Sequence, residues 1–144
     1  MTRTLTHWIG GESYEGTPTR RIPVENPATG QVESEILAAG LTDLDHAVEV
    51  ARAAQKKWAR VSLAARTAIM FKMRELVLAN QVEIARAIVN EHGKDFGDAI
   101  GEIQRGRETL DFATGINMAL RGEHSFDIST GIDIHTVRQP VGVV

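Results

Sequence analysis

The spacing of apolar residues divides the chain into an extended first part and a helical middle part, with the change near residue 42. Before it, short alternating runs at 6–9, 21–24 and 31–37 are separated by Gly-Gly and by the sequence Asn-Pro-Ala-Thr-Gly at 26–30. Because Gly and Asn-Pro end strands, these runs predict short strands joined by turns.

After residue 42, apolar residues recur every three or four positions, which is typical of amphipathic helices. The pattern predicts four helices, over residues 43–59, 63–79, 81–92 and 96–120.

Polar residues and glycine mark the ends of these helices. Thr42 with Asp45 resembles a capping box at the first start, while Ser62 and Asn80 are candidate N-caps for the next two. Gly93 is placed to stop the third helix in a left-handed conformation.

The fourth helix should be weakened by its glycines, each costing up to about 1 kcal/mol relative to alanine. Close packing against another backbone would explain them, since glycine lacks the side chain that holds two elements apart. They occupy positions 97, 101, 106 and 115.

The last part of the chain is extended again. Alternation over residues 126–137 around Ser-Thr-Gly predicts a β-hairpin. Residues 141–144 (Val-Gly-Val-Val) have no polar face, which predicts a strand buried inside a parallel sheet. Such a strand needs covering partners, so we expect part of the sheet to be missing here.

Composition argues against a nucleic-acid or membrane partner. The chain has 144 residues, of which 42% are apolar and 24% charged, as in a single globular unit. A net charge of -3, with no long basic block, argues against a nucleic-acid partner. No apolar run reaches the roughly 18 residues that cross a bilayer, and no secretory leader is apparent, so we expect a cytoplasmic protein with no membrane partner.

The residues that could carry chemistry are few. With no cysteine, the chain has no disulfide, thiolate ligand or cysteine nucleophile. The pairs Gly10-Gly11 and Gly93-Lys94 lack phosphate-loop spacing and read as a turn and a helix stop. No two histidines are three or four residues apart, so no metal pair on a helix is expected; they occupy positions 7, 46, 92, 124 and 135. The two tryptophans, Trp8 and Trp58, read as packing anchors.

Several short motifs resemble the N-terminal part of the aldehyde dehydrogenase superfamily, in its order and spacing. They are Trp-Ile-Gly-Gly-Glu at 8–12, Val-Glu-Asn-Pro-Ala-Thr-Gly at 24–30, Glu-His-Gly-Lys at 91–94 and Arg-Gln-Pro-Val-Gly-Val-Val at 138–144. Gly-Glu-Ile-Gln-Arg-Gly at 101–106 and Gly-Ile-Asp-Ile at 131–134 are most similar to methylmalonate-semialdehyde dehydrogenases.

The resemblance implies an aldehyde dehydrogenase-like α/β family, of which this chain is an α+β portion. Residues 1–120 would form strands and four helices around the NAD-binding domain, and 121–138 an oligomerisation hairpin. Residues 139–144 would begin the Rossmann-like core strand. The implied partners are the remainder of the polypeptide and further copies of the enzyme, as a dimer or tetramer.

The implied activity is oxidation of an acid semialdehyde to acyl-CoA with decarboxylation, using NAD and CoA, as in valine catabolism. The family's catalytic cysteine and glycine motif have no counterpart in these residues. We therefore expect no catalytic or cofactor-binding residue here and no activity from the isolated chain, because the covalent catalysis of this family needs a nucleophile that attacks the aldehyde carbon.

One residue carries over with a role. Arg105 matches a family position that faces the substrate tunnel, where a guanidinium can bind a substrate carboxylate with two hydrogen bonds. The alternative is an ordinary polar stripe of Asp98, Glu102, Arg105 and Thr109, with Glu102 and Arg105 as an exposed ion pair.

Glu91 matches an acidic position that in some relatives helps to bind a monovalent cation, together with main-chain carbonyls near Val24 and Glu25. Carboxylate and carbonyl oxygens suit a hard cation. The alternative is a solvated carboxylate in the last turn of a helix.

Two classes of function remain open. The chain is either part of a semialdehyde dehydrogenase, of the methylmalonate type or another such as the succinate type, or a noncatalytic helical module. A module would bind partners by adding its hairpin to another sheet edge.

Overall fold

The computed structural model describes residues 3–18 and 20–144, and it has an α+β fold. Two of the predicted helices have the expected bounds, the first begins two residues earlier, and the fourth ends six residues earlier. The helices are α1 (Leu41–Trp58), α2 (Leu63–Ala79), α3 (Gln81–His92), α4 (Phe96–Thr114) and the short α5 (Ile116–Ala119).

The helix caps correct one prediction and confirm another. The N-cap of α1 is Gly40 and not Thr42, and its N–H donates to the Asp43 carboxylate at 2.8 Å. Asp45 therefore has no part in the cap. Ser62 caps α2 as predicted, because its hydroxyl accepts a hydrogen bond from the Ala65 N–H at 3.2 Å.

The junction between α2 and α3 differs from its prediction. Asn80 is the N-cap by position, but its side chain donates to the Leu76 carbonyl at 2.8 Å and makes no cap hydrogen bond to α3. The amide thus closes the end of α2, where carbonyls lack partners, instead of opening α3.

Gly93 ends α3 as predicted, with a positive φ of 71°. A Cβ at this position would lie 2.8 Å from the Ala28 backbone nitrogen and 3.0 Å from Pro27. Glycine is required here for two reasons, the left-handed conformation and the close approach of the turn that follows residue 26.

The packing explanation for the glycines of α4 stays a prediction. A Cβ at Gly106 would meet nothing within 4 Å, and one at Gly101 would meet only Nη1 of Arg105, at 3.9 Å. No backbone of another element lies against them among the described residues. Gly115 ends α4 before residue 120, which splits the predicted helix in two.

Within the described residues, seven strands form three small sheets. The first sheet has the order β1-β5-β4, with β4 antiparallel and β1 parallel to β5; the others are the hairpins β2–β3 and β6–β7. The sequence pattern did not predict β1 or β3. The strands are β1 (Arg3–Leu5), β2 (His7–Ile9), β3 (Glu12–Tyr14), β4 (Arg21–Asn26), β5 (Gln31–Leu37), β6 (His124–Ser129) and β7 (Ile132–His135).

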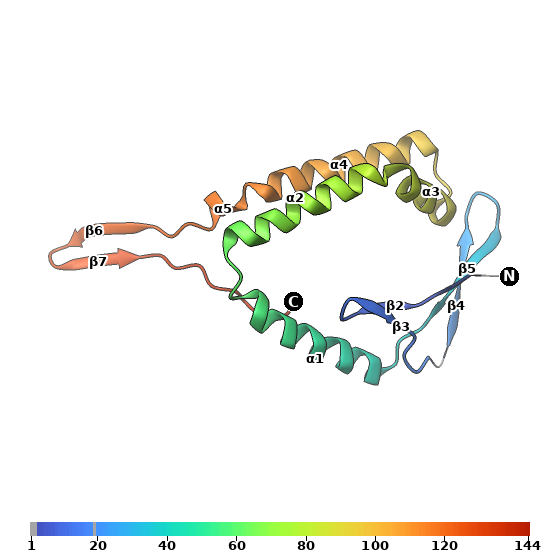
Figure 1. Ribbon diagram of the computed structural model, residues 1–144, viewed down its shortest axis with the longest axis horizontal. Helices are drawn as coiled ribbons and strands as arrows, with labels where there is room; N and C mark the ends of the chain where they lie inside the picture. Colours follow the sequence, from blue (N-terminus) through green and yellow to red (C-terminus); the bar gives the residue numbers. More distant parts are fainter. Residues whose placement is uncertain (1–2, 19) are drawn as a thin grey trace.

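Figure 1 shows α1 and the β2–β3 hairpin on one side of the molecule and the paired helices α2 and α4 on the other. The three-stranded sheet and α3 join the two sides at one end. The core is small and lies where α3 and α4 meet: Ala85 and Ala99 are fully buried and Ile103 is 9% exposed.

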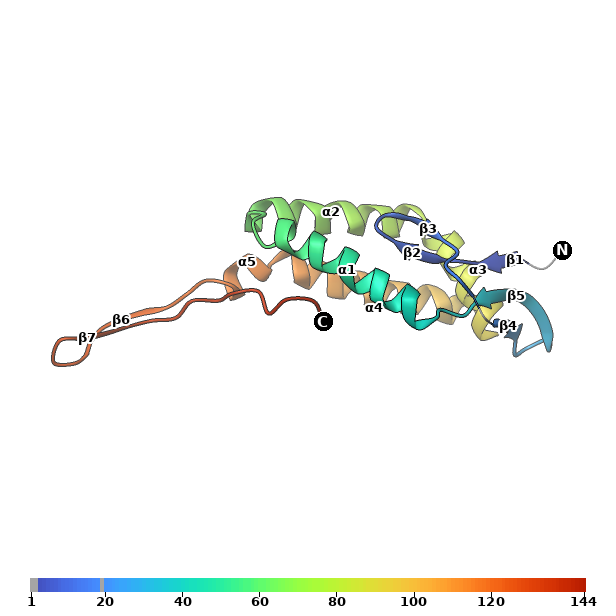
Figure 2. The ribbon, with the colours of Figure 1, turned by 90° about the horizontal axis from the view of Figure 1, so that it is seen from below.

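The β6–β7 hairpin, here called the arm, extends away from the helices in both ribbon views (Figures 1 and 2), and all of its strand residues are exposed. The buried strand predicted at residues 141–144 does not form, since these residues have no regular structure and Val141 is 94% exposed. A parallel strand needs a neighbour, and no described strand lies beside this segment.

The two predicted packing anchors are partly exposed among the described residues, Trp8 at 75% and Trp58 at 41%. Trp58 carries the guanidinium of Arg66 over its ring, 5.6 Å from the centroid. Among the helices of the described chain, none combines the length and apolar character that a membrane crossing requires.

Candidate functional site

Arg105 lies on the exposed face of α4, one turn after Gly101. Its guanidinium is directed back along the helix toward Gly101, as long side chains in helices prefer. Its carbonyl accepts a hydrogen bond from the Thr109 hydroxyl at 3.2 Å. No carboxylate within residues 3–18 and 20–144 forms an ion pair with this guanidinium.

The Glu102–Arg105 ion pair of the alternative interpretation does not form. Glu102 pairs instead with Lys94, whose Nζ lies 2.7 Å from its carboxylate oxygen; the Lys94 side chain is only 16% exposed. The hydrogen bond from Lys94 is the main reason that the pKa of Glu102 lies below its ordinary value, and the positive charges of His92 and Arg105 add to the effect.

Asp43 is a second polar centre, and its sequence signal was misread. The carboxylate is 2% exposed and accepts hydrogen bonds from the Gly40 N–H at 2.8 Å, the Thr17 N–H at 3.1 Å and the Tyr14 hydroxyl at 3.2 Å. These donors, with the Gly40 N–H the largest contribution, lower the pKa of Asp43. The cluster joins residues 14–17 to the start of α1, so its role is structural.

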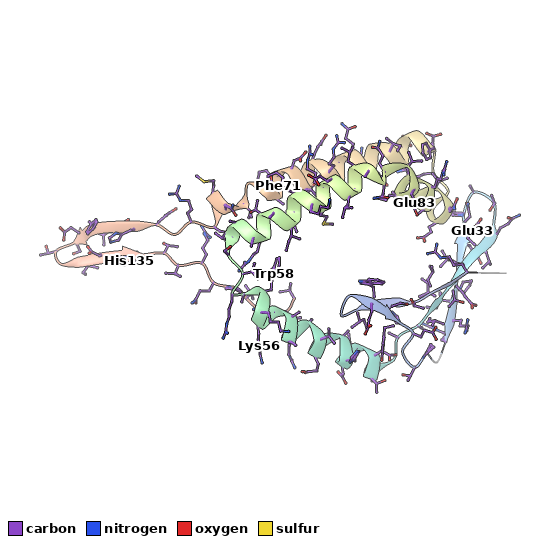
Figure 3. All side chains as sticks on the ribbon, in the orientation of Figure 1. Glu33, Lys56, Trp58, Phe71, Glu83 and His135 are labelled. Carbon is purple, nitrogen blue, oxygen red and sulfur yellow. The ribbon has the colours of Figure 1, made fainter. Side chains whose placement is uncertain are left out.

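Glu91 lies at the end of α3 and lines a small cavity of about 150 Å³. Arg3 and Glu33 also line the cavity. Figure 3 shows Glu33 on the three-stranded sheet. Val24 and Glu25, whose carbonyls were expected to join Glu91, do not line it. Cation binding by Glu91 stays a prediction.

The histidines show what spacing along the chain misses. His124 and His135 are eleven positions apart but pair across β6 and β7, with their rings stacked 4.0 Å apart. Figure 3 places His135 on the arm, far from the helices. Across the described ranges, no group of three or more His, Asp or Glu side chains is arranged to hold a metal ion.

The two glycine pairs have the structural roles predicted for them. Gly10 and Gly11 form the turn between β2 and β3, both with positive φ. Gly93 ends α3 in a left-handed conformation.

Large apolar surfaces flank α1. A cavity of about 670 Å³ lies between the turn at Gly10 and the alanine-rich face of this helix, and another of about 610 Å³ lies between Trp58 and Val143. Neither contains a cluster of catalytic groups.

Residues 14–144 match the aldehyde dehydrogenase family. The chain belongs to this family. Its fold agrees: the structure superposes with a TM-score of 0.93 on a Sinorhizobium meliloti 1021 protein assigned as a methylmalonate-semialdehyde dehydrogenase and complexed with NAD. The two are 39% identical, over 99% of this chain and 29% of that one.

Other members of the aldehyde dehydrogenase family give the same result. The methylmalonate-semialdehyde dehydrogenase DddC of Oceanimonas doudoroffii has a TM-score of 0.90 and 37% identity, over 97% of this chain and 28% of that one. The malonate-semialdehyde dehydrogenase 2 of Oceanobacillus iheyensis is 37% identical over 99% of this chain. The chain spans 29% of the length of that relative.

Proposed function

We propose that this chain is the N-terminal part of an NAD-dependent, CoA-acylating dehydrogenase that oxidises malonate or methylmalonate semialdehyde. The observation that carries the proposal is Arg105, an exposed guanidinium without an acidic partner among the described residues. It lies on a chain that is 37–39% identical to dehydrogenases of these two acid semialdehydes.

The chemistry of the substrate explains why a free guanidinium would matter. A semialdehyde of this class carries a carboxylate at the end opposite its aldehyde. A planar guanidinium can hold both carboxylate oxygens at once, which fixes the orientation of the molecule as well as its position. The role of Arg105 would be to bind and orient the substrate, and a neutral aldehyde would gain nothing from it.

We assign neither the covalent nucleophile nor the NAD and CoA sites to residues of this chain. When bound, NAD would accept a hydride and CoA the acyl group. The 144 residues contain no cysteine to hold the substrate covalently. Of the two glycine pairs, one forms a hairpin turn and the other lies at the end of α3. We therefore assign no catalytic or cofactor-binding residue to this chain.

The partners in this proposal are the rest of the dehydrogenase and further copies of it. The apolar faces beside α1 suit the missing polypeptide, and the exposed arm suits a sheet edge in another copy. The noncatalytic module remains the second candidate, because the arm offers unpaired strand edges whether or not an active site is present.

A hybrid enzyme tests the proposal. The 144 residues are joined to the matching remainder of the Sinorhizobium meliloti relative, and its activity on acid semialdehydes is compared with that on neutral aldehydes. R105L should lower kcat/KM for the acid substrates about 10- to 100-fold, the effect of losing a charge-assisted pair of hydrogen bonds, and change the neutral ones about twofold or less.

R86L is the matched control, since it removes an exposed guanidinium from the neighbouring helix α3. Equal losses for acid and neutral substrates in R105L would remove Arg105 from the substrate site. A hybrid that does not oxidise acid semialdehydes would contradict the proposed activity, and reduction of NAD by the isolated chain would contradict the assignment of catalysis to other residues.

A further inference from the structure

The ion pair between Lys94 and Glu102 lies one turn from Arg105 and has no part in the function proposed above. Glu102 precedes Arg105 by three positions on α4, a spacing at which Glu and Arg ordinarily pair. The carboxylate instead contacts Lys94, at the bend between α3 and α4. The structure therefore separates two side chains that their own helix would bring together.

The direction of the Arg105 side chain makes Glu102 the relevant competitor. Its Nη1 lies near Gly101, on the N-terminal side, where Glu102 also lies. The other acidic neighbour, Glu108, is on the C-terminal side and accepts a hydrogen bond from Gln104 at 3.5 Å.

We propose that Lys94 is a positioning residue for substrate selection: by holding Glu102, it keeps the Arg105 guanidinium free for the carboxylate of an acid semialdehyde. This rests on the proposed function of Arg105. Without Lys94, Glu102 turns to Arg105 and competes with the substrate, as an internal carboxylate in the place of an external one.

Burial and charge support this role. Lys94 is largely buried, so its ammonium is held in place and less screened by water than an exposed lysine. Its positive charge also offsets the negative field of Glu102 at the guanidinium. The other charged groups that act on Glu102 are His92 and Arg105, and neither forms an ion pair with it among the described residues.

The first experiment uses the 144-residue chain alone and needs no substrate. The pKa of Glu102 is measured by NMR in the parent, K94M, R105L and K94M/R105L. Removing Arg105 should raise this pKa by a larger amount in the K94M background than in the parent, because only then does Glu102 pair with Arg105. Equal shifts in both backgrounds would overturn the inference.

The second experiment uses the hybrid enzyme and measures the ratio of kcat/KM for acid semialdehyde to that for a neutral aldehyde. K94M should lower the ratio about 2- to 5-fold, the effect of competition by an exposed ion pair, mainly through KM. K94M/E102Q should restore it, because the competing carboxylate is gone.

E102Q alone should keep the ratio within about twofold of the parent. This variant keeps Lys94, so it tests the inference even if the K94M protein fails to fold. A much larger rise in E102Q would mean that Glu102 competes even beside Lys94, and would overturn the inference. If K94M has no effect while R105L abolishes acid preference, the inference is wrong and the proposed function stands. If R105L leaves the preference intact, the proposed function itself is wrong.

Discussion

The α3–α4 junction buries apolar side chains, whereas the arm exposes them. At the junction, Ala85 and Ala99 are fully buried, and Gly93 fits against the turn at Ala28. Along the arm every strand residue is exposed, including Phe126 at 76%. The junction satisfies its apolar groups within the chain, whereas the arm leaves them for something else to cover.

An Ile→Ala substitution in each region should give the largest difference in the free energy of unfolding. I103A should lower the free energy of unfolding by about 2–5 kcal/mol, because it removes methyl groups from the core and leaves a cavity. I134A, at a side chain that is 46% exposed, should change it by about 0.5 kcal/mol or less. Urea unfolding measures both, and similar losses would contradict the contrast.

I134A should act on assembly instead. The variant should weaken any self-association of the chain in analytical ultracentrifugation, whereas I103A should not do so while folded.

Substituting two glycines with similar φ, Gly93 and Gly30, tests how much the close packing at the junction contributes to stability. G93A should cost about 2–4 kcal/mol, since it combines a strained left-handed residue with a Cβ 2.8 Å from the Ala28 nitrogen. G30A has nearly the same φ but nothing within 4 Å of its Cβ, so it should cost only about 1–2 kcal/mol. Equal costs would show that the close approach at Gly93 contributes nothing.

The smallest effect concerns Asp43, which joins the first strands to α1. Because folding lowers the pKa of Asp43 from its ordinary 3.8, the unfolded chain takes up a proton first as the pH falls. The stabilisation from this group is complete above about pH 4 and is lost below it. D43N should be less stable at pH 7 and lose less on acidification, in urea unfolding at pH 7 and pH 3. D45N, at an exposed neighbour, should keep the acid sensitivity of the parent.

Local signals made α2 and α3 predictable from the sequence. Ser62 bonds to a residue three positions away, and Gly93 marks a helix end by its own conformation, so both could be recognised without knowledge of the fold. The start of α1 was misplaced because Asp43 also serves donors at Tyr14 and Thr17, far back in the chain.

The candidate site was predicted only in part, because some of its contacts join residues that are not neighbours on one helix. The position of Arg105 on α4 followed from helical spacing, but the partner of Glu102 did not, because Lys94 reaches it across a bend. The pairing of His124 with His135 depends on strand register and was missed. The exposure of Trp8 depends on what covers α1, which the described residues do not supply.

The parallel pairing of β1 with β5 has a consequence for synthesis. The partner of Arg3, Ser34, is made roughly thirty residues after it, and β1 bonds to no other strand in its sheet. At translation speeds of about 5–20 residues per second, β1 waits about 2–6 s before it can pair. During that interval the nascent chain exposes a short strand without a template, which a ribosome-bound chaperone could occupy.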